Sequence, residues 1–141
     1  MNAPTIAKDR KIKVIESKSK TVVGYPSQIS IRLRKKGEER VISGTVIGKE
    51  PRIVQLDDYM IDVIPSGHMI VTKIEDHPNI IGPCCMILGK NNINIAGMQV
   101  GRINIGGDAI MVLNIDSDVS DDILEEIKSI DGIIDAKRAT L

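Results

Sequence analysis

The 141-residue chain has almost no aromatic side chains: it contains two Tyr, no Trp and no Phe. Proteins that bind single-stranded nucleic acid stack the bases on such rings, so their scarcity disfavours that class of partner. Net charge is missing too, because 19 Lys and Arg offset 19 Asp and Glu. Without a positive field, phosphate backbones and anionic membranes are not attracted. We therefore expect an aliphatic core and no nucleic-acid partner.

The chain has only two cysteines, Cys84 and Cys85, and they are adjacent. Neighbouring cysteines rarely reach unstrained disulfide geometry, so we interpret both as small buried hydrophobes. The two histidines, His68 and His77, have no Cys or carboxylate pair at metal-ligand spacing, which disfavours a metal site. No apolar run approaches the ~18 residues that cross a bilayer, and no signal peptide is recognisable. These absences predict a cytoplasmic protein without membrane association.

The sequence also lacks the signals of a catalytic centre. No G-x-G-x-x-G motif follows a predicted strand, so a dinucleotide site is not expected. No constellation of His, Arg and an acidic residue suits hydride transfer from a hydroxy acid. We therefore predict neither a catalytic residue nor a cofactor in this chain, and we look for a binding function.

Residues 1–66 have the pattern of an antiparallel meander with one short helix. A helix is predicted at 3–10, and apolar residues at every second position predict half-buried strands at 11–14 and 28–34. Polar turns then lead into predicted strands at 41–47, 52–56 and 59–64. A sheet with one apolar face needs a second layer, and one short helix covers little of it. Either this half docks on another unit or its beginning is missing.

Residues 67–141 follow a different pattern, in which strands alternate with helices. The predicted elements are strand 68–74, helix 79–90, strands 93–102 and 108–115, helix 120–130 and strand 133–140. This βαββαβ order is the ferredoxin-like plan, with two helices on one face of an antiparallel sheet. Ser120 or Asp118 suits the start of the second helix. The whole chain is thus predicted to be α+β.

The passage Glu75-Asp76-His77-Pro78-Asn79 at the predicted start of the first helix has binding chemistry. Free N–H groups at a helix start attract a carboxylate, and an acidic side chain beside them suits an ammonium group. Together they select a zwitterion. Two plainer interpretations stay open: Asp76 could cap the helix, and Asn94 in its apolar strand could satisfy backbone groups. We expect His77 at the loop surface.

Residues 67–141 contain a series of short pieces in a definite order: Ile80-Ile81-Gly82, Ile87-Leu88-Gly89, Asn92-Ile93-Asn94-Ile95-Ala96, Met98-Gln99-Val100-Gly101-Arg102, 106–113 and Asp131-Gly132-Ile133. In these pieces and their order, residues 67–141 resemble the ACT domain in the C-terminal regulatory region of D-3-phosphoglycerate dehydrogenase. Residues 1–66 resemble the end of that enzyme's allosteric substrate-binding domain. The pieces there are Asn2-Ala3-Pro4, Ser43-Gly44-Thr45-Val46, Pro51-Arg52-Ile53-Val54 and Pro65-Ser66-Gly67.

The resemblance implies an ACT domain that senses L-serine or a related small amino acid for feedback control. Two copies would join as a homodimer through their sheet edges, with the effector between the loop before the first helix and the partner copy. Asp76 would meet the ammonium group, Asn94 other polar groups, and the backbone of Asn79, Ile80 and Ile81 the carboxylate. Arg52 falls where the first domain of the family can bind a phosphorylated anion.

Three functions are consistent with these residues. The leading one is a serine-binding regulatory region, whose NAD-dependent catalytic domains would lie elsewhere. The second is an ACT-containing subunit of an L-serine dehydratase, although its iron-sulfur chemistry needs several spaced cysteines and this chain has an adjacent pair. The third is a structural oligomerisation module with a decayed effector site, which the residues Ile74 and Asn79 would fit.

Overall fold

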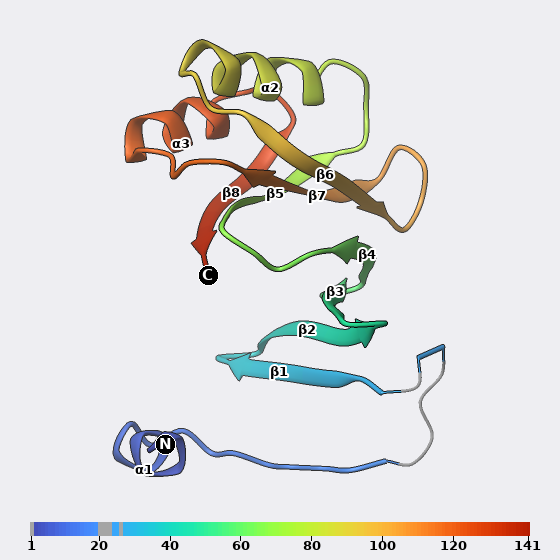
Figure 1. The fold of residues 1–141 in the computed structure, drawn as a ribbon, viewed down its shortest axis with the longest axis vertical. Coiled ribbons are helices and arrows are strands. Elements are labelled where there is room, and N and C mark those ends of the chain that lie inside the picture. The colour runs from blue at the N-terminus through green and yellow to red at the C-terminus, as the bar shows by residue number, and fades with distance from the viewer. Residues whose placement is uncertain (1, 20–23, 26) are drawn as a thin grey trace.

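The structure is a computed structural model and describes residues 2–19, 24–25 and 27–141. Within these residues the chain forms three helices and eight strands, and the strands make two antiparallel sheets of four. Figure 1 shows the two sheets one above the other, with two helices at the far side of the second sheet. The predicted α+β class is confirmed.

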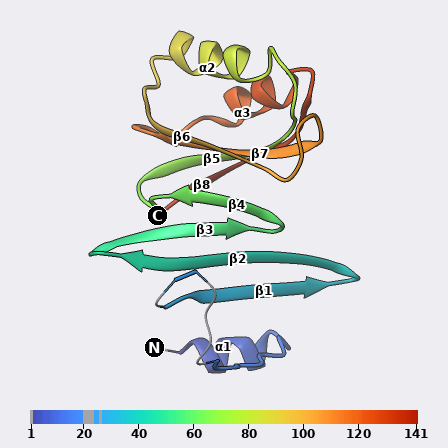
Figure 2. The ribbon, with the colours of Figure 1, turned by 90° about the vertical axis from the view of Figure 1, so that its right-hand side faces the viewer.

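The first sheet is a meander in which each strand pairs with the next one along the chain. Its strands are β1 (Ile29–Lys35), β2 (Glu38–Ile47), β3 (Glu50–Leu56) and β4 (Tyr59–Val63), in that spatial order. Figure 2 shows them as successive rungs. The turns have the backbone that tight hairpins require, with positive φ at Lys36, Gly37 and Asp57. The predicted meander is therefore confirmed.

The segment before β1 does not join this sheet. Helix α1 (Ala3–Asp9) has no buried residue, and residues 12–19 run extended without forming a strand. The strand predicted at 11–14 is wrong, and Ile12 and Val14 are 53% and 70% exposed. Alternating apolar residues form a strand only beside an edge with which they can pair, and Figure 1 shows this segment running clear of β1. The predicted half-burial of β1 is also wrong, since all seven of its residues are exposed.

The second sheet confirms the predicted βαββαβ order. Its strands are β5 (His68–Glu75), β6 (Ile95–Arg102), β7 (Asp108–Ile115) and β8 (Ile133–Thr140), in the spatial order β6-β7-β5-β8. Helices α2 (Ile81–Lys90) and α3 (Asp121–Lys128) cover one face, as Figures 1 and 2 show. Strands β6 and β8 are the edges of the sheet.

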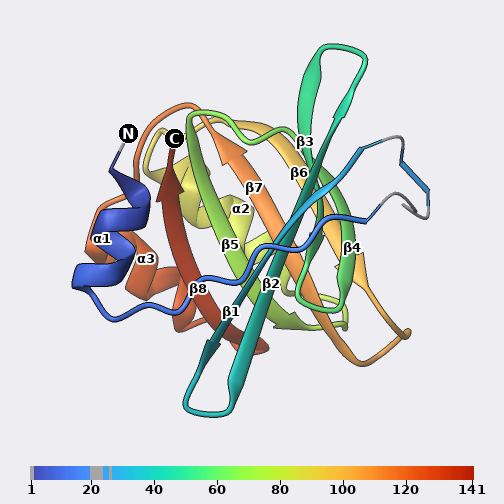
Figure 3. The same cartoon turned by 90° about the horizontal axis from the view of Figure 1, so that it is seen from below.

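The two central strands of the second sheet are buried on both faces. On β7, Met111 and Leu113 face the helices, while Ile110 and Val112 face the meander. The meander supplies Tyr59, Ile61 and Val63 from β4 to this second cluster. Figure 3 shows β4 beside β6, on the side of the sheet away from the helices. Residues 1–66 therefore dock in part on residues 67–141, which is the first of the two alternatives given for the uncovered face of the meander.

The ends of the two helices follow local chemistry. Ser120 caps α3, because its side chain accepts the N–H of Ile123 at 3.4 Å. Helix α2 begins at Ile81, two residues later than predicted, because Asn79 has a left-handed φ of 70° that no helix continues. Cys84 is buried in α2, where desolvation raises the pKa of its thiol to about 11, whereas Cys85 is only half-buried. Burial of both cysteines was predicted, and it holds fully for Cys84.

Candidate functional site

The loop after β5 holds Asp76 between two other segments of the second sheet. The N–H of Asp76 donates to the carbonyl of Gly107 at 2.7 Å, and the N–H of Gly106 donates to its Oδ2 at 3.2 Å. The Arg102 guanidinium lies 3.4 Å from the same oxygen. The Asp76 side chain is only 16% exposed, so a charge is held at a defined, mostly desolvated place.

The backbone between Asp76 and α2 is fixed by a turn and a buried anchor. Asn79 takes the left-handed conformation, which Asn tolerates better than most residues. The Ile80 side chain is fully buried in the helix-side core, so this residue offers only its backbone to a ligand. His77 lies at the loop surface as predicted, with its Nδ1 atom 2.8 Å from the carbonyl of Pro78.

The alternative in which Asp76 caps α2 is wrong. The N-cap residue is Ile80, and no side chain caps this helix. The Asp76 carboxylate points instead to the hairpin between β6 and β7. The first N–H groups of a helix lack partners within the helix, so those of Ile81 and Gly82 remain donors for a bound anion. Pro83 follows them and has no N–H to offer.

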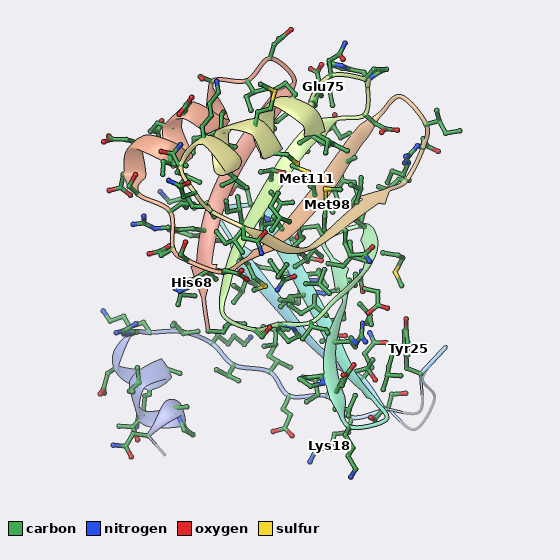
Figure 4. The ribbon with its side chains drawn as sticks, turned by 45° about the horizontal axis from the view of Figure 1, so that its top comes forward. Lys18, Tyr25, His68, Glu75, Met98 and Met111 are labelled. Carbon is green, nitrogen blue, oxygen red and sulfur yellow. The ribbon has the colours of Figure 1, made fainter. Side chains whose placement is uncertain are left out.

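Asn94 lies at the opposite end of the sheet from Asp76. Its amide donates to Asp116 Oδ2 at 2.8 Å, beside the end of β7 where Ile95 pairs with Ile115. Asp76 lies beyond the other end of β7, near Asp108. Eight residues of strand separate the two ends, which is roughly 23 Å. In Figure 4, Glu75 and His68 mark the corresponding two ends of β5. One copy of the chain thus does not bring Asp76 and Asn94 together.

Arg52, the predicted anion-binding residue, is held by acidic neighbours in the first sheet. Its Nη1 lies 3.1 Å from Asp62 Oδ1, and its Nη2 lies 2.8 Å from Glu50 Oε2. The hydrogen bond with Glu50 is the largest cause that raises the pKa of Arg52 above its ordinary value. Within the described residues, Arg52 Nε is buried and has no hydrogen-bond partner. Two carboxylates around one guanidinium repel an anion, so these contacts do not favour the predicted role.

Sequence reasoning missed two groups at the Asp76 loop, Arg102 and the N–H of Gly106. Both come from the hairpin between β6 and β7, and Gly106 is 30 residues away from Asp76 along the chain. Periodicity gives no signal for them, because they depend on strand register: Glu75 pairs with Asp108, and Arg102 pairs with Ala109. The end of β5, the end of β6 and the start of β7 therefore lie at the same end of the sheet.

In the part of the chain that the structure describes, no group of three or more His, Cys, Asp and Glu residues could hold a metal ion. No helix in these residues is long and apolar enough to span a bilayer.

This chain is similar in sequence to known proteins of one family. The family model of the D-3-phosphoglycerate dehydrogenase intervening domain matches residues 1–57. A D-3-phosphoglycerate dehydrogenase of Archaeoglobus fulgidus is 40% identical over 138 residues, which is 96% of this chain and 26% of that protein. The chain is homologous to the C-terminal region of D-3-phosphoglycerate dehydrogenases. The resemblance stated from the sequence is thus confirmed.

Further D-3-phosphoglycerate dehydrogenases agree with this assignment. That of Methanocaldococcus jannaschii is 41% identical over 135 residues and that of Bacillus subtilis is 36% identical over 138 residues. These matches cover 96% and 97% of this chain. The chain spans 26% of the length of each of these curated relatives. The similarity therefore crosses both sheets, beyond the residues that the family model matches.

Proposed function

We propose that this region of a D-3-phosphoglycerate dehydrogenase binds L-serine, or a related small amino acid, and so regulates the dehydrogenase. The observation that supports it most is the mostly buried Asp76 carboxylate beside the uncapped start of α2. An ammonium group would bind Asp76, and a carboxylate would bind the backbone of Asn79, Ile80 and Ile81 at the start of α2. In this proposal the cofactor NAD belongs to the parent enzyme's other domains.

The opposite positions of Asp76 and Asn94 support a site that two copies share. Edge strand β6 runs from Ile95 to Arg102, and no other strand of the described residues pairs with its outer side. An antiparallel pairing of β6 with a second β6, centred on Met98, would put position 94 opposite position 102, because each lies four residues from the centre. Arg102 is next to Asp76, so Asn94 of one copy would then lie near Asp76 of the other. Figure 4 shows Met98 on this strand.

Such a dimer would regulate by population shift. A ligand held between two copies stabilises the arrangement in which the shared site is complete. Serine then inhibits an attached enzyme if this arrangement is the less active one. A preference of about 1 to 3 kcal/mol per site is sufficient for ordinary feedback.

Titration calorimetry of the purified chain with L-serine tests the proposal directly. We expect saturable heat at serine concentrations up to about millimolar, the affinity of a small polar ligand with a few charged contacts. Sedimentation of the same sample reports whether the protein is dimeric. A folded dimer that gives no heat with serine, glycine or threonine would contradict an amino-acid sensor.

Met98→Asp will prevent dimerisation and serine binding together. The two introduced carboxylates would lie directly opposite in the paired β6 strands, where like charges destabilise pairing. Sedimentation and calorimetry measure the two effects. Ile134→Asp is the matched control, because Ile134 is exposed to a similar extent (48% against 45%) but lies on β8, the other edge. If the dimer survives Met98→Asp and is lost with Ile134→Asp, the interface is at β8 and the proposed pairing of β6 strands is wrong.

One observation favours a purely structural oligomerisation module as the second candidate. Ile74 is 2% exposed and packs into the helix-side core, so it offers no group to a ligand. A module of this kind would dimerise through β6 equally well with and without serine. Dimer affinity measured with and without saturating serine separates the two candidates, because only a sensor couples them.

A further inference from the structure

Arg102 lies beside Asp76, at the start of the proposed ligand site. Its Nη1 is 3.4 Å from Asp76 Oδ2, and its side chain is 52% exposed. The 3.4 Å separation exceeds that of a strong charge-assisted hydrogen bond, which is about 2.7 to 2.9 Å. The guanidinium is therefore close to Asp76 and still accessible to another anion.

Arg102 is on the same face of the second sheet as the start of α2. Side chains two residues apart on a strand point to the same face, and Val100 packs against the helix-side core. The neighbouring cation, Lys73, is on the opposite face, where it lies 2.6 Å from Asp108. That hydrogen bond is the largest cause that raises the pKa of Lys73 above its ordinary value. Lys73 is therefore engaged elsewhere, and Arg102 faces the site.

We propose that Arg102 binds the carboxylate of the ligand, so that the Asp76–Arg102 pair recognises an α-amino acid by both of its charges. This rests on the proposed function and adds the residue that sets the ligand class. The ammonium and carboxylate of an α-amino acid are separated by one carbon, so they can meet neighbouring charges of opposite sign. Arg102 adds a charged, potentially bidentate partner to the N–H groups of α2.

Asp76 can accept the ligand's ammonium group without losing all of its other contacts. When Arg102 turns towards the ligand carboxylate, the N–H of Gly106 still donates to Asp76 Oδ2. The ligand's own positive charge replaces that of Arg102. The site therefore keeps its charges paired with and without ligand, which a mostly buried carboxylate requires.

Selectivity for paired charges follows from this arrangement. Ethanolamine has the ammonium and hydroxyl groups of serine but no carboxylate, so it leaves Arg102 without a ligand partner. β-Alanine carries both charges but separates them by two carbons. We expect serine to bind more tightly than either compound, and the difference from ethanolamine to depend on Arg102.

Calorimetry of the full chain with serine and ethanolamine tests the assignment. Arg102→Gln is expected to weaken serine binding roughly 10-fold to 100-fold, the loss of a charged hydrogen bond. Ethanolamine binding should not weaken and should become tighter, because ethanolamine has no carboxylate to draw Arg102 away from Asp76. Arg102→Lys should recover part of the affinity, because a point charge remains. Arg40→Gln is the matched control, since Arg40 is a similarly exposed arginine that pairs with Asp57 in the first sheet. Circular dichroism confirms that each variant is folded.

The outcomes separate this inference from the proposed function. If the wild type binds serine and folded Arg102→Gln binds it equally well, the Arg102 assignment is overturned and the sensor stands. Tighter serine binding by Arg102→Gln also overturns it, because Arg102 would then compete with the ammonium group for Asp76. If the wild type binds no amino acid, both the sensor and the Arg102 assignment fail.

Discussion

Replacing Gly132 by alanine will lower the free energy of unfolding by about 2 to 5 kcal/mol. Gly132 has a φ of 87°, a left-handed backbone that costs other residues about 1 to 2 kcal/mol. An added Cβ would also overlap Ile80 Cδ1 and lie 2.9 Å from His77 Nε2. Ile80 is fully buried and cannot move freely, so overpacking adds about 1 to 3 kcal/mol. Urea denaturation followed by circular dichroism measures the loss.

Gly67→Ala separates the two causes of this loss. Gly67 also has a positive φ, of 61°, but its Cβ would meet no described residue within 4 Å apart from its two chain neighbours. This control should lose only the backbone contribution, about 1 to 2 kcal/mol. Equal losses in the two variants would show that the space around Ile80 is not tight. The residual ligand affinity of Gly132→Ala reports whether the loop after β5 has moved as well.

Asp76→Ala will abolish serine binding in the concentration range where the wild type saturates. Removing the mostly buried Asp76 carboxylate, which would pair with the ligand's ammonium group, costs about 2 to 4 kcal/mol of binding free energy, or roughly 30-fold to 700-fold in affinity. Asn94→Ala should also weaken binding, because its amide would face the same ligand from the other copy. Calorimetry of each variant measures the two losses.

Mixing the Asp76→Ala and Asn94→Ala proteins tests whether two copies share the site. In a mixed dimer, one site receives the intact Asp76 from one copy and the intact Asn94 from the other. The second site lacks both groups. Serine binding should therefore return in the mixture at a stoichiometry of one site per mixed dimer. If the mixture binds no better than its components, each site lies within one copy.

The second half of the fold could be predicted from the sequence because its pattern changes where its structure does. Mostly apolar runs become β5 and β7, and a helical stripe ending near Lys90 becomes α2. The strand predicted at 11–14 shows where pattern alone fails. Ile12 and Val14 alternate with lysines as in a strand, yet strand formation depends on a partner edge that local sequence does not specify.

The candidate site could be predicted only where its residues are close in sequence. Asp76 and Asn79 were found because both lie just before the start of one helix. The contacts of Asp76 with Gly106 and Arg102 were missed because strand register decides them, and periodicity does not fix register between distant strands. The position of Asn94 at the opposite end of the sheet agrees with the predicted antiparallel plan, because β6 begins beside the end of β7.

At Gly101, strand β6 of the second sheet is in close contact with strand β4 of the first sheet. A Cβ at Gly101 would lie 2.7 Å from both Ile61 Cγ2 and the carbonyl oxygen of Met60, so the β6 backbone rests directly on β4. Close-packed groups transmit displacement because they have no slack to absorb it. A displacement of β6 towards β4 would therefore displace the meander as well, so the edge of the second sheet is coupled to the first sheet.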